Sequence, residues 1–420
     1  MTRTMKDSGV EWIGQIPEDW EFHKLKYHIH IKSGDMLTKS DLTDDGIFPV
    51  YGGGEMIGYA NKSNTKCNQI LIGRVGARCG CVTLPEKDCW ATDNALVITS
   101  LLPIKLLYYS LVAADLNNIN ISNAQPLITG NKVKNIIIPF PPLPEQQAIA
   151  DYLDDKCAQI DNITATINEQ IEVLKQYKKS VITEAVTKGL DPNVPMKDSG
   201  VEWIGQIPEK WNIERFKYNF SFAKGLQITK ADLTEEGCPV ISYGQIHSKI
   251  NTGVNVNSEL IRFVSTDYQY EKSSIAKYGD IIWADTSEDY EGIGNSIFIN
   301  CSKNIFAGYH TIITKPLFNS ITKYFAYLFQ TDVWRLQLRK QATGIKVFSI
   351  TQKMLKNCNI LIPSIPEQQV ISDYLDDKCA QIDAVIADKQ AQLETLAAYK
   401  KSLIYEYVTG KKSVPGFEEA

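Results

Sequence analysis

The chain is a tandem repeat of two long segments. Residues 5–20 and 196–211 match at fifteen of sixteen positions, at an offset of 191. Residues 141–161 and 363–383 match at seventeen of twenty-one positions, at an offset of 222. A solenoid repeats about every 20–50 residues. The much longer period found here therefore predicts a duplicated pair of domains.

The bodies between the matched segments differ from each other. They are residues 21–140 and 212–362, which make 120 and 151 residues. They share little beyond one early stretch, at 37–50 and 228–240. Duplication for stability alone is one explanation, and it predicts that matched segments and bodies diverge equally. Matched segments around different bodies instead favour one symmetric frame, formed by the matched segments, that holds two bodies with different ligands.

The second matched segment of each repeat predicts a long helix. Pro144 and Glu145 suit a first helical turn, and Lys188-Gly189 followed by Pro192 suits a helix end. Between them, apolar residues step by four and three, as in a coiled-coil heptad. The helices form either an antiparallel coiled coil or, as the alternative, a separate cover for each body's core. The predicted seam holds Ile149, Leu153, Ile160, Ile163, Ile167, Leu174, Tyr177 and Val181, and in the second copy Ile371, Leu375, Ile382, Val385, Leu396, Tyr399 and Leu403, with Lys156, Gln170, Lys378, Lys389 and Gln392 at polar seats.

We predict an α+β fold. It has two globular domains of mixed sheet and short helices, separated by two long helices that form an antiparallel coiled coil, in a pseudo-two-fold tandem repeat. Short β-branched runs predict the sheets, and apolar stretches at 104–114 and 321–338 predict the short helices. The expected boundaries are 1–144 and 191–366 for the globular domains, 145–190 and 367–412 for the helices, and 413–420 for a C-terminal tail.

Acidic residues are concentrated in the two predicted helices. The net charge is −5. Residues 1–144 are neutral and 191–366 carry +2, whereas 145–190 carry −3 and 367–420 carry −4. This distribution leaves room for a local positive face on each globular domain, as nucleic-acid binding requires.

Membrane and secretion signals are missing from the sequence. No window approaches the roughly 18 uninterrupted apolar residues of a membrane span, and the charged start of the chain does not resemble a signal peptide. Nine cysteines, an odd number, argue against a secreted disulfide scaffold. We therefore expect a cytoplasmic protein.

The first body carries basic and aromatic residues among glycines. Arg74 and Arg78 lie on a glycine-bounded turn, which suits contact with phosphates or with a guanine edge. Our candidates for binding one DNA half-site are Tyr51, Arg74, Arg78, Asn94 and Lys132. For any one of them taken alone, an ordinary solvated surface residue is the alternative.

The second body carries a different set of such residues. Tyr243, Gln245 and Lys249 interleave aromatic, amide and basic side chains, which is the mixture that base readout uses. Arg339 and Lys346 complete our candidates for a second DNA half-site. The same alternative applies to each of them.

Motifs for catalysis and metal binding are absent from the sequence. It contains no GxxxxGK[ST], GxSxG or HExxH string and no Asn-Pro-Pro or Asp-Pro-Pro run. His28 and His30 share a strand face without an acidic partner, and the four cysteines between residues 67 and 89 lack zinc-site spacing. We expect no catalytic residue, no metal site and no cofactor bound by this chain.

The repeated motifs resemble those of the specificity (S) subunits of Type I restriction–modification systems, the HsdS family. The resemblance covers essentially the whole chain. It rests on Gly-Val-Glu-Trp-Ile-Gly-Gln-Ile-Pro-Glu-x-Trp at 9–20 and 200–211, and on Pro-x-x-Pro-Glu-Gln-Gln before a long helix, at Pro141 and Pro363.

Two shorter strings of the first body also resemble elements of the target-recognition domains in that family. They are Ile-Gly-Arg-Val-Gly at 72–76 and Thr-Asp-Asn-Ala at 92–95. In the second body, Trp283-Ala284-Asp285 and Tyr309-His310 stand roughly in their places, which implies a different half-site.

This resemblance implies that each globular domain reads one half of a bipartite, asymmetric site in double-stranded DNA. The helices would hold the domains apart and dock two methyltransferase (M) subunits, and motor–nuclease (R) subunits would join for restriction. S-adenosylmethionine, ATP and Mg would be used by these partners. Two alternatives stay open: the recognition subunit of a Type IIB-like system, and a self-contained enzyme with duplicated substrate domains.

Overall fold

The computed structural model describes residues 3–76, 78–119, 127–202, 204–317, 322–344 and 346–417. Ala77, between the two arginines of the predicted turn, Trp203 in the second copy of the first motif, and Ile321 at the start of a predicted helix lie outside the described residues. The chain divides into two compact units. Unit 1 comprises residues 1–169 with 389–420, and unit 2 comprises residues 170–388.

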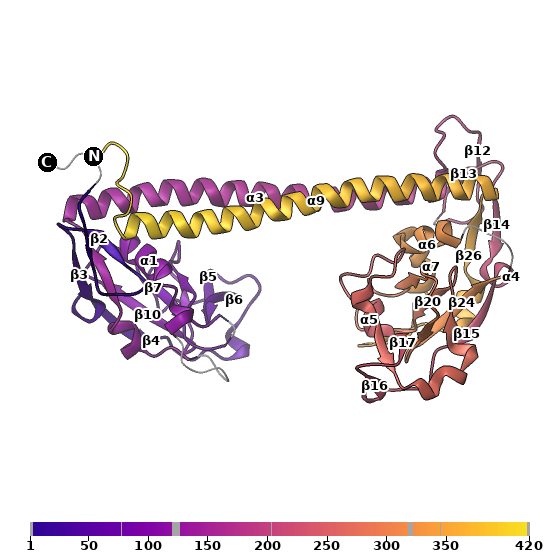
Figure 1. The fold of residues 1–420 in the computed structure, drawn as a ribbon, viewed down its shortest axis with the longest axis horizontal. Helices are drawn as coiled ribbons and strands as arrows, with labels where there is room; N and C mark the ends of the chain where they lie inside the picture. Colours follow the sequence, from indigo (N-terminus) through magenta and orange to yellow (C-terminus); the bar gives the residue numbers. More distant parts are fainter. Residues whose placement is uncertain are drawn as a thin grey trace. The chain divides into compact units, whose positions relative to one another are not determined.

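Two sheets form the globular part of unit 1 (Figure 1). The first is antiparallel, and its central strand β10 is almost fully buried because both neighbours and the short helices cover it. The second contains one parallel pair, β5 with β9. The first sheet has the order β4 (Ile29–Ser33), β10 (Ala95–Ser100), β7 (Ile70–Gly73), β8 (Val82–Thr83); the second has β6 (Glu55–Ala60), β5 (Phe48–Gly52), β9 (Trp90–Ala91); two further pairs are β1 (Met5–Asp7) with β2 (Gln15–Pro17) and β3 (Glu21–Lys24) with β11 (Ile137–Phe140).

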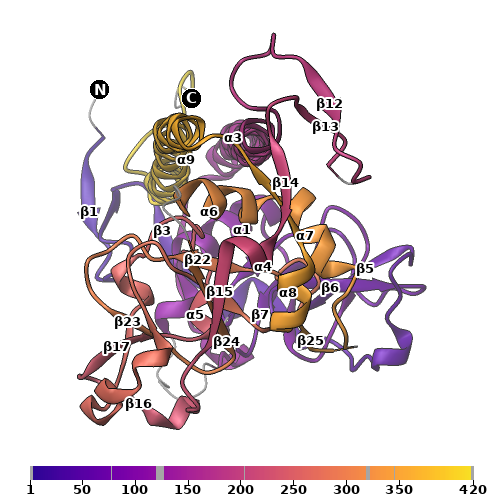
Figure 2. The same ribbon diagram turned by 90° about the vertical axis from the view of Figure 1, so that its right-hand side faces the viewer.

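Unit 2 repeats this arrangement with additions (Figure 2). Its four-stranded antiparallel sheet corresponds strand by strand to that of unit 1, and its second sheet again holds one parallel pair, β17 with β23. The four-stranded sheet has the order β15 (Phe220–Lys224), β24 (Thr311–Pro316), β20 (Ile281–Ala284), β22 (Ser296–Phe298); the second has β16 (Leu233–Thr234), β18 (Arg262–Val264), β17 (Cys238–Ile241), β23 (Ile305–Ala307), β19 (Ile275–Ala276); the pairs are β12 (Met196–Asp198) with β13 (Gln206–Pro208), β14 (Asn212–Arg215) with β26 (Asn359–Ile362), and β21 (Thr286–Ser287) with β25 (Phe348–Ser349).

Short helices flank these sheets, which confirms the predicted α+β class. The helix predicted over 321–338 is two helices, because Thr331 ends the first and its hydroxyl accepts a hydrogen bond from the Trp334 amide (3.3 Å) as the N-cap of the second. Unit 1 holds α1 (Ile104–Ala113) and α2 (Gly130–Lys134); unit 2 holds α4 (Phe216–Asn219), α5 (Tyr243–Ile246), α6 (Thr322–Gln330), α7 (Asp332–Arg339) and α8 (Gln352–Asn357). Single 3-10 turns lie at Leu25–Tyr27, Lys39–Asp41, Leu116–Ile119, Lys230–Asp232, Ser258–Leu260, Thr266–Tyr270 and Lys272–Ser274.

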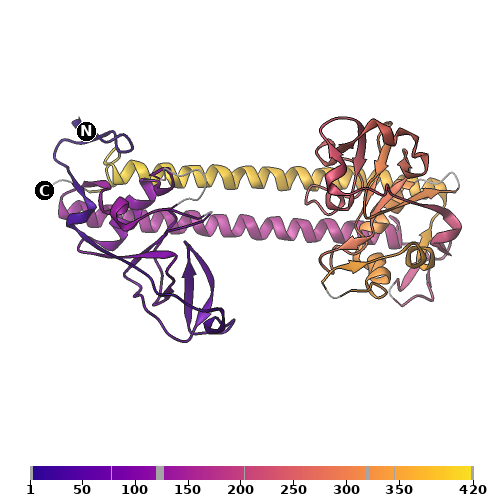
Figure 3. The same cartoon turned by 90° about the horizontal axis from the view of Figure 1, so that it is seen from below.

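Two long helices, α3 (Leu143–Lys188) and α9 (Ile365–Val408), each run from one unit into the other. Within each unit the first half of one helix lies antiparallel to the second half of the other (Figures 1 and 3). Lys400 Nζ binds both carboxylate oxygens of Asp161 in unit 1 (2.6 and 2.8 Å). Lys178 binds Asp383 in the same way in unit 2 (2.7 Å to each oxygen). The two pairs are related by the 222-residue offset, so the helices pair in the same register in both units.

The seam of the helix pair differs from the predicted one at every second position. Six buried or half-buried residues of α3 were predicted correctly: Ile149, Leu153, Ile160, Ile167, Leu174 and Val181. Four predicted seam residues are instead about half exposed, at 49, 48, 45 and 54%: Ile163, Tyr177, Val385 and Tyr399. That part of the prediction is wrong. The predicted polar seats Lys156, Gln170 and Lys378 are wrong as well, because the residues that follow them, Cys157, Ile171 and Cys379, are the buried ones.

The globular part of each unit explains this shift. A tyrosine of a short helix donates a hydrogen bond to an aspartate on one flank of the long helix: Tyr109 to Asp154 (2.8 Å) in unit 1 and Tyr327 to Asp376 (2.7 Å) in unit 2. Because the globular part covers that flank, the buried residues of the long helix lie on the side that faces the sheets. Residues on the opposite flank, such as Ile163, are left to solvent.

The first hairpin of each repeat packs on the end of the helix that belongs to the other repeat. In unit 1 the carbonyl oxygen of Ile13 accepts hydrogen bonds from Tyr405 (3.2 Å) and Lys411 (2.6 Å) at the end of α9. Gly410 follows this helix with φ 67°, and a Cβ there would collide with Pro17. Hairpin β12–β13 makes the equivalent contact with the end of α3 in unit 2. The hairpins and the long helices are nearly identical in the two repeats, and each hairpin contacts a helix of the other repeat. This mutual contact explains why both kinds of segment match.

The described helices include none with the length and the apolar character needed to cross a membrane.

Candidate nucleic-acid interface

Four turns of unit 1 meet at one end of its antiparallel sheet. The Arg74 amide donates to the carbonyl oxygen of Asn94 (2.9 Å), which joins the end of β7 to the start of β10. The Thr92 amide donates to the carbonyl oxygen of Tyr51 (3.0 Å), which adds the β5–β6 turn. Gly34, after β4, lies so close to this group that a Cβ would collide with the carbonyl oxygen of Thr92. Backbone hydrogen bonds and a required glycine thus hold the turns together.

Four of the five predicted residues of half-site 1 lie on these turns or, for Tyr51, in the strand β5 that leads into one of them. Arg74 is half-buried, and its Nη1 lies 3.4 Å from the Ser33 hydroxyl. Asn94 is exposed, and Tyr51 is half-buried, with burial raising the pKa of its hydroxyl. Arg78 is exposed and forms an ion pair with Glu55 across the β5–β6 turn, with 2.8 Å between Nε and Oε2.

The fifth predicted residue, Lys132, lies on α2, which begins two residues after the hydrogen bond from the Ile128 amide to the Arg74 carbonyl oxygen (3.0 Å). It lines a separate shallow hollow of about 480 Å³ with Val10 and Trp12 of the first hairpin. The described contacts therefore bring Tyr51, Arg74, Arg78 and Asn94 into one set but leave Lys132 outside it.

The corresponding end of the unit 2 sheet is a cleft of about 720 Å³. The Asp285 amide donates to the carbonyl oxygen of His310 (3.1 Å), and Asp285 Oδ1 lies 3.4 Å from His310 Nδ1. Burial raises the pKa of the Asp285 carboxyl, although the nearby His310 opposes this. The polar residues that line the cleft are Lys224, Gln227, Thr229, Asp285, Tyr309, His310, Thr311, Thr351, Gln352 and Lys353.

An aromatic cluster adjoins this cleft. The ring of Tyr243 lies 5.5 Å from that of Tyr309, 5.5 Å from that of His310 and 6.2 Å from that of His247, centroid to centroid. His310 has φ 54°, a left-handed backbone conformation that is costly for a residue other than glycine. Strain held in place by surrounding contacts is common at functional sites.

The remaining predicted residues of half-site 2 are used differently. Gln245 Oε1 accepts from the Ser242 amide (3.1 Å) and so caps α5. Arg339 is buried, and its guanidinium binds Asp332 (2.8 Å) and Glu291 (3.2 Å) inside unit 2. Lys249 and Lys346 are exposed and do not line the cleft. Of the five, only Tyr243 contacts the cleft residues.

Sequence reasoning did not select the charged residues that line the cleft, such as Lys224 and Lys353. The sequence does contain a pattern that could have identified them. Gly225 follows Gly34 at the 191-residue offset, and a Cβ at Gly225 would likewise collide with a backbone carbonyl, that of Gly308. The two glycines mark the same turn in both repeats, so their neighbours are the residues to compare.

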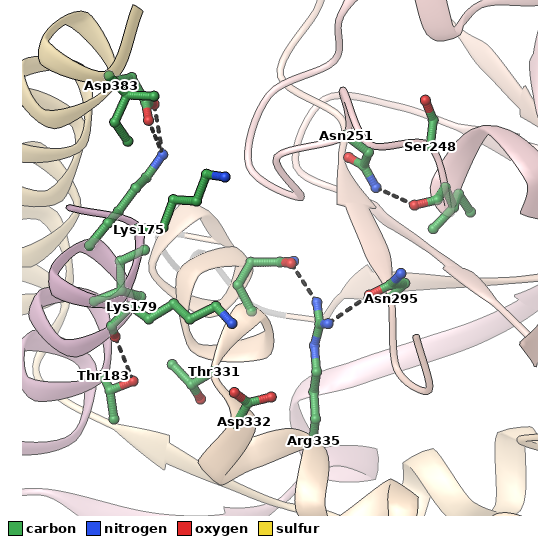
Figure 4. Close-up of a pocket in the computed structure, with 15 residues that line it drawn as sticks. Lys175, Lys179, Thr183, Ser248, Asn251, Asn295, Thr331, Asp332, Arg335 and Asp383 are labelled. Atoms are coloured by element: carbon green, nitrogen blue, oxygen red, sulfur yellow. Dashed lines mark hydrogen bonds and ion pairs between the residues drawn. The ribbon is translucent and has the colours of Figure 1, made fainter. Parts of the chain in front are cut away.

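A second hollow of unit 2, about 500 Å³ in volume, lies between α3 and the globular part (Figure 4). Lys175 and Lys179 extend into it from α3. On the opposite wall, Arg335 is held by the carbonyl oxygen of Phe329 (2.8 Å) and by Asn295 Oδ1 (2.6 Å). Burial and the neighbouring Arg339 lower the pKa of Arg335 to about 10. The hollow is thus lined by several cations.

The equivalent place in unit 1 is neutralised. Lys401 follows Lys179 at the 222-residue offset and forms an ion pair with Asp115, with 2.9 Å between Nζ and Oδ2. The two units therefore differ in charge at this position as well as at the turns.

The chain matches the family model described as "Type I restriction modification DNA specificity domain" twice, over residues 17–173 and 208–395. It is 28% identical over 419 residues to the Type I restriction enzyme MjaVIII specificity subunit of Methanocaldococcus jannaschii, with 94% of each chain covered. It is 26% identical to the putative type I restriction enzyme MjaX specificity subunit of the same organism, with 95% of each covered.

A solved chain from work on complex assembly and conformational transition of the type I R-M system has the same fold. Its TM-score is 0.67 at 15% identity, with 94% of this chain and 99% of that chain covered. The two family matches, one in each repeat, together span most of the sequence. The chain therefore belongs to the family of Type I restriction–modification DNA specificity subunits, HsdS.

Proposed function

We propose that each unit reads one half of a bipartite, asymmetric site in double-stranded DNA and so directs adenine methylation and restriction by partner subunits. One observation carries this proposal. The two units hold the same turns on the same sheet, but the side chains on those turns differ in charge and hydrogen-bonding character. A common frame with two sets of donors and acceptors suits two different base sequences.

The basic hollow of unit 2 supports a role in positioning DNA. Phosphate contacts fix the orientation of a protein on the duplex without reading sequence. Lys175 and Lys179 stand one helical turn apart, which suits contact with the phosphate backbone. Lys175 is paired with Glu172, and Lys401, the unit 1 counterpart of Lys179, is paired with Asp115. We therefore assign this role mainly to Lys179 of unit 2.

The long helices would set the number of unread base pairs between the half-sites. They contain 46 and 44 residues, which corresponds to about 66–69 Å of helix. Their paired lysine–aspartate contacts favour one register over others, as polar seam residues do in coiled coils. A fixed register gives a fixed spacing.

An outer stripe on the long helices supports the docking of two methyltransferase subunits. We define it as Ile163 with Tyr399 in unit 1 and Val385 with Tyr177 in unit 2. Heptad geometry places such residues of two paired helices on the same flank, and all four are about half exposed. The 222-residue offset relates Ile163 to Val385 and Tyr177 to Tyr399. Two matching surfaces suit two copies of one partner.

Catalysis would come from the partners. The sequence offers no phosphate-loop or methyltransferase motif, so we assign S-adenosylmethionine to the methyltransferase subunits, and ATP with Mg to the motor–nuclease subunits. A Type IIB-like partner set is the alternative, and the chains that co-purify with this one distinguish the two. We expect the purified chain alone to show no methylation, cleavage or ATPase activity.

A body exchange tests the proposal directly. Residues 21–140 are replaced by residues 212–362, so that both matched frames carry the second body. The exchanged chain, assembled with its methyltransferase partner, should methylate a site in which the second half-sequence occurs twice. Retention of the first half-sequence would show that the body does not carry recognition.

A further inference from the structure

The backbones of the two sheets correspond residue by residue. Across β7 and β10, Gly73 pairs with Ala95. Across β20 and β24, Ala284 pairs with Thr311. These pairs are the last of each strand pair before the turns, so the residues that follow β7 and β20, and those that precede β10 and β24, occupy equivalent positions.

The equivalent positions hold Arg74 with Asn94 in unit 1 and Asp285 with His310 in unit 2. The same backbone hydrogen bond joins each pair, from the amide of the first residue to the carbonyl oxygen of the second, at 2.9 Å and 3.1 Å. This hydrogen bond is thus common to both units, whereas the backbone is left-handed at His310 (φ 54°) and not at Asn94, and the side chains differ.

The hydrogen-bonding character of the first residue is inverted between the units. A guanidinium offers donors only, and an ionised carboxylate offers acceptors only. Asp285 is about one-third exposed, at 31% of its side chain, and it lines the cleft. Its Oδ1 makes no hydrogen bond with the described protein groups and lies 3.4 Å from His310 Nδ1. Because Oδ1 is buried beside His310, it is the exposed remainder of the Asp285 carboxylate in the cleft that offers acceptor lone pairs to a donor from a ligand.

We propose that Asp285 reads a cytosine in half-site 2, at the position where Arg74 reads a guanine in half-site 1. The N4 amino group of cytosine is a donor in the major groove and suits a carboxylate. Guanine presents the acceptors O6 and N7, and thymine presents O4, all of which a carboxylate repels. Adenine offers a donor at N6 but places the acceptor N7 beside it, against the second carboxylate oxygen. This inference rests on the proposed function.

The test uses the full chain assembled with its methyltransferase partner and a DNA library randomised over its own site. The Asp285→Asn variant keeps the shape of the side chain but adds a donor, which suits the N6 and N7 pair of adenine. We expect one position of half-site 2 to change from cytosine toward adenine, with a loss of cytosine discrimination of roughly tenfold or more. Half-site 1 should be unchanged.

A second measurement leaves the protein unchanged and so does not depend on the folding of a variant. The cytosine is replaced by 2-pyrimidinone, which lacks the N4 amino group. Wild-type affinity should fall roughly tenfold, and the affinity of the Asp285→Asn variant should fall much less. The Arg74→Gln variant is the matched control, because it should alter a guanine position of half-site 1 only.

The results that overturn the inference differ from those that overturn the proposed function. A wild-type half-site 2 without cytosine, an unchanged base preference in Asp285→Asn, or wild-type affinity that is insensitive to the loss of N4 would each refute the role of Asp285. Absence of any sequence preference in the wild-type complex would instead refute the proposed function.

Discussion

Removing one tyrosine of the outer stripe should cost the assembled complex one methyltransferase subunit. Tyr399 belongs to the stripe of unit 1 and Tyr177 to that of unit 2, and they are 54% and 48% exposed. Each is replaced by Ala, singly and together. Exposed helix positions tolerate such changes within about 0.5 kcal/mol, so the chain itself should fold normally.

The expected loss of binding follows from the exposed area. A fully buried aromatic side chain removes about 150–250 Å² from water, so a half-exposed tyrosine has about 100 Å² left to bury on docking. At about 25 cal/mol per Å², this contributes up to about 2.5 kcal/mol, of which part is offset by the cost of ordering the interface. We expect a loss of about 1–2.5 kcal/mol, or roughly fivefold to seventyfold in affinity.

Native mass spectrometry of the reconstituted complex measures the stoichiometry directly. At concentrations well above the dissociation constant of the wild-type sites but below that of the altered sites, wild type should carry two methyltransferase subunits, each single variant should carry one, and the double variant should carry none. Tyr278→Ala is the control, because Tyr278 is 70% exposed but lies on the globular part of unit 2. Loss of both subunits from one single variant, or two retained in the double variant, would refute the assignment of the stripe.

Three further predictions concern the DNA. Arg74→Ala should weaken binding to the complex's own site by about 1–3 kcal/mol, measured by titration, with the loss confined to half-site 1. Replacing Lys179 by Ala should weaken binding on all sequences and reduce the slope of log K against log salt by about 1. Inserting seven residues after both Glu169 and Asp388 adds about 10 Å of helix and should lengthen the unread spacer by about 3 base pairs, read from the methylated sequence.

Each of these has a matched control. Arg78→Ala should have a smaller effect than Arg74→Ala, because Arg78 already pairs with Glu55. Lys401→Ala should leave the salt slope nearly unchanged, because Lys401 is paired with Asp115. A four-residue insertion shifts the heptad seam and should damage assembly. An unaltered spacer in an active seven-residue variant would mean that the helices do not set the distance.

The tandem repeat allowed most of the fold to be predicted from the sequence. It did not decide which residues of the long helices form the buried seam. Leu153, Ile160 and Ile167 are seven apart and lie in the seam under either of two heptad registers. The choice between Ile163 and Thr164 depends on which flank the globular part covers, and hydrogen bonds such as Tyr109 to Asp154 are invisible in a heptad count. The apolar periodicity is compatible with both heptad registers, and tertiary packing selects one of them.

The candidate site was predicted better in the first body than in the second for a similar reason. Arg74 and Asn94 could be selected by their surrounding motifs. Arg339 could not be told from a surface arginine, because its partners Asp332 and Glu291 come together only in the folded chain. Residue type alone does not show whether a charge is paired internally.

Mapping methylated adenines across a genome that carries the intact system tests the central claim most directly. We predict one split sequence made of two different halves, separated by a fixed number of unread base pairs, with methylation that disappears when this chain is deleted. A continuous sequence, a palindromic pair of identical halves, or methylation that persists without this chain would contradict the assignment of one half-site to each unit.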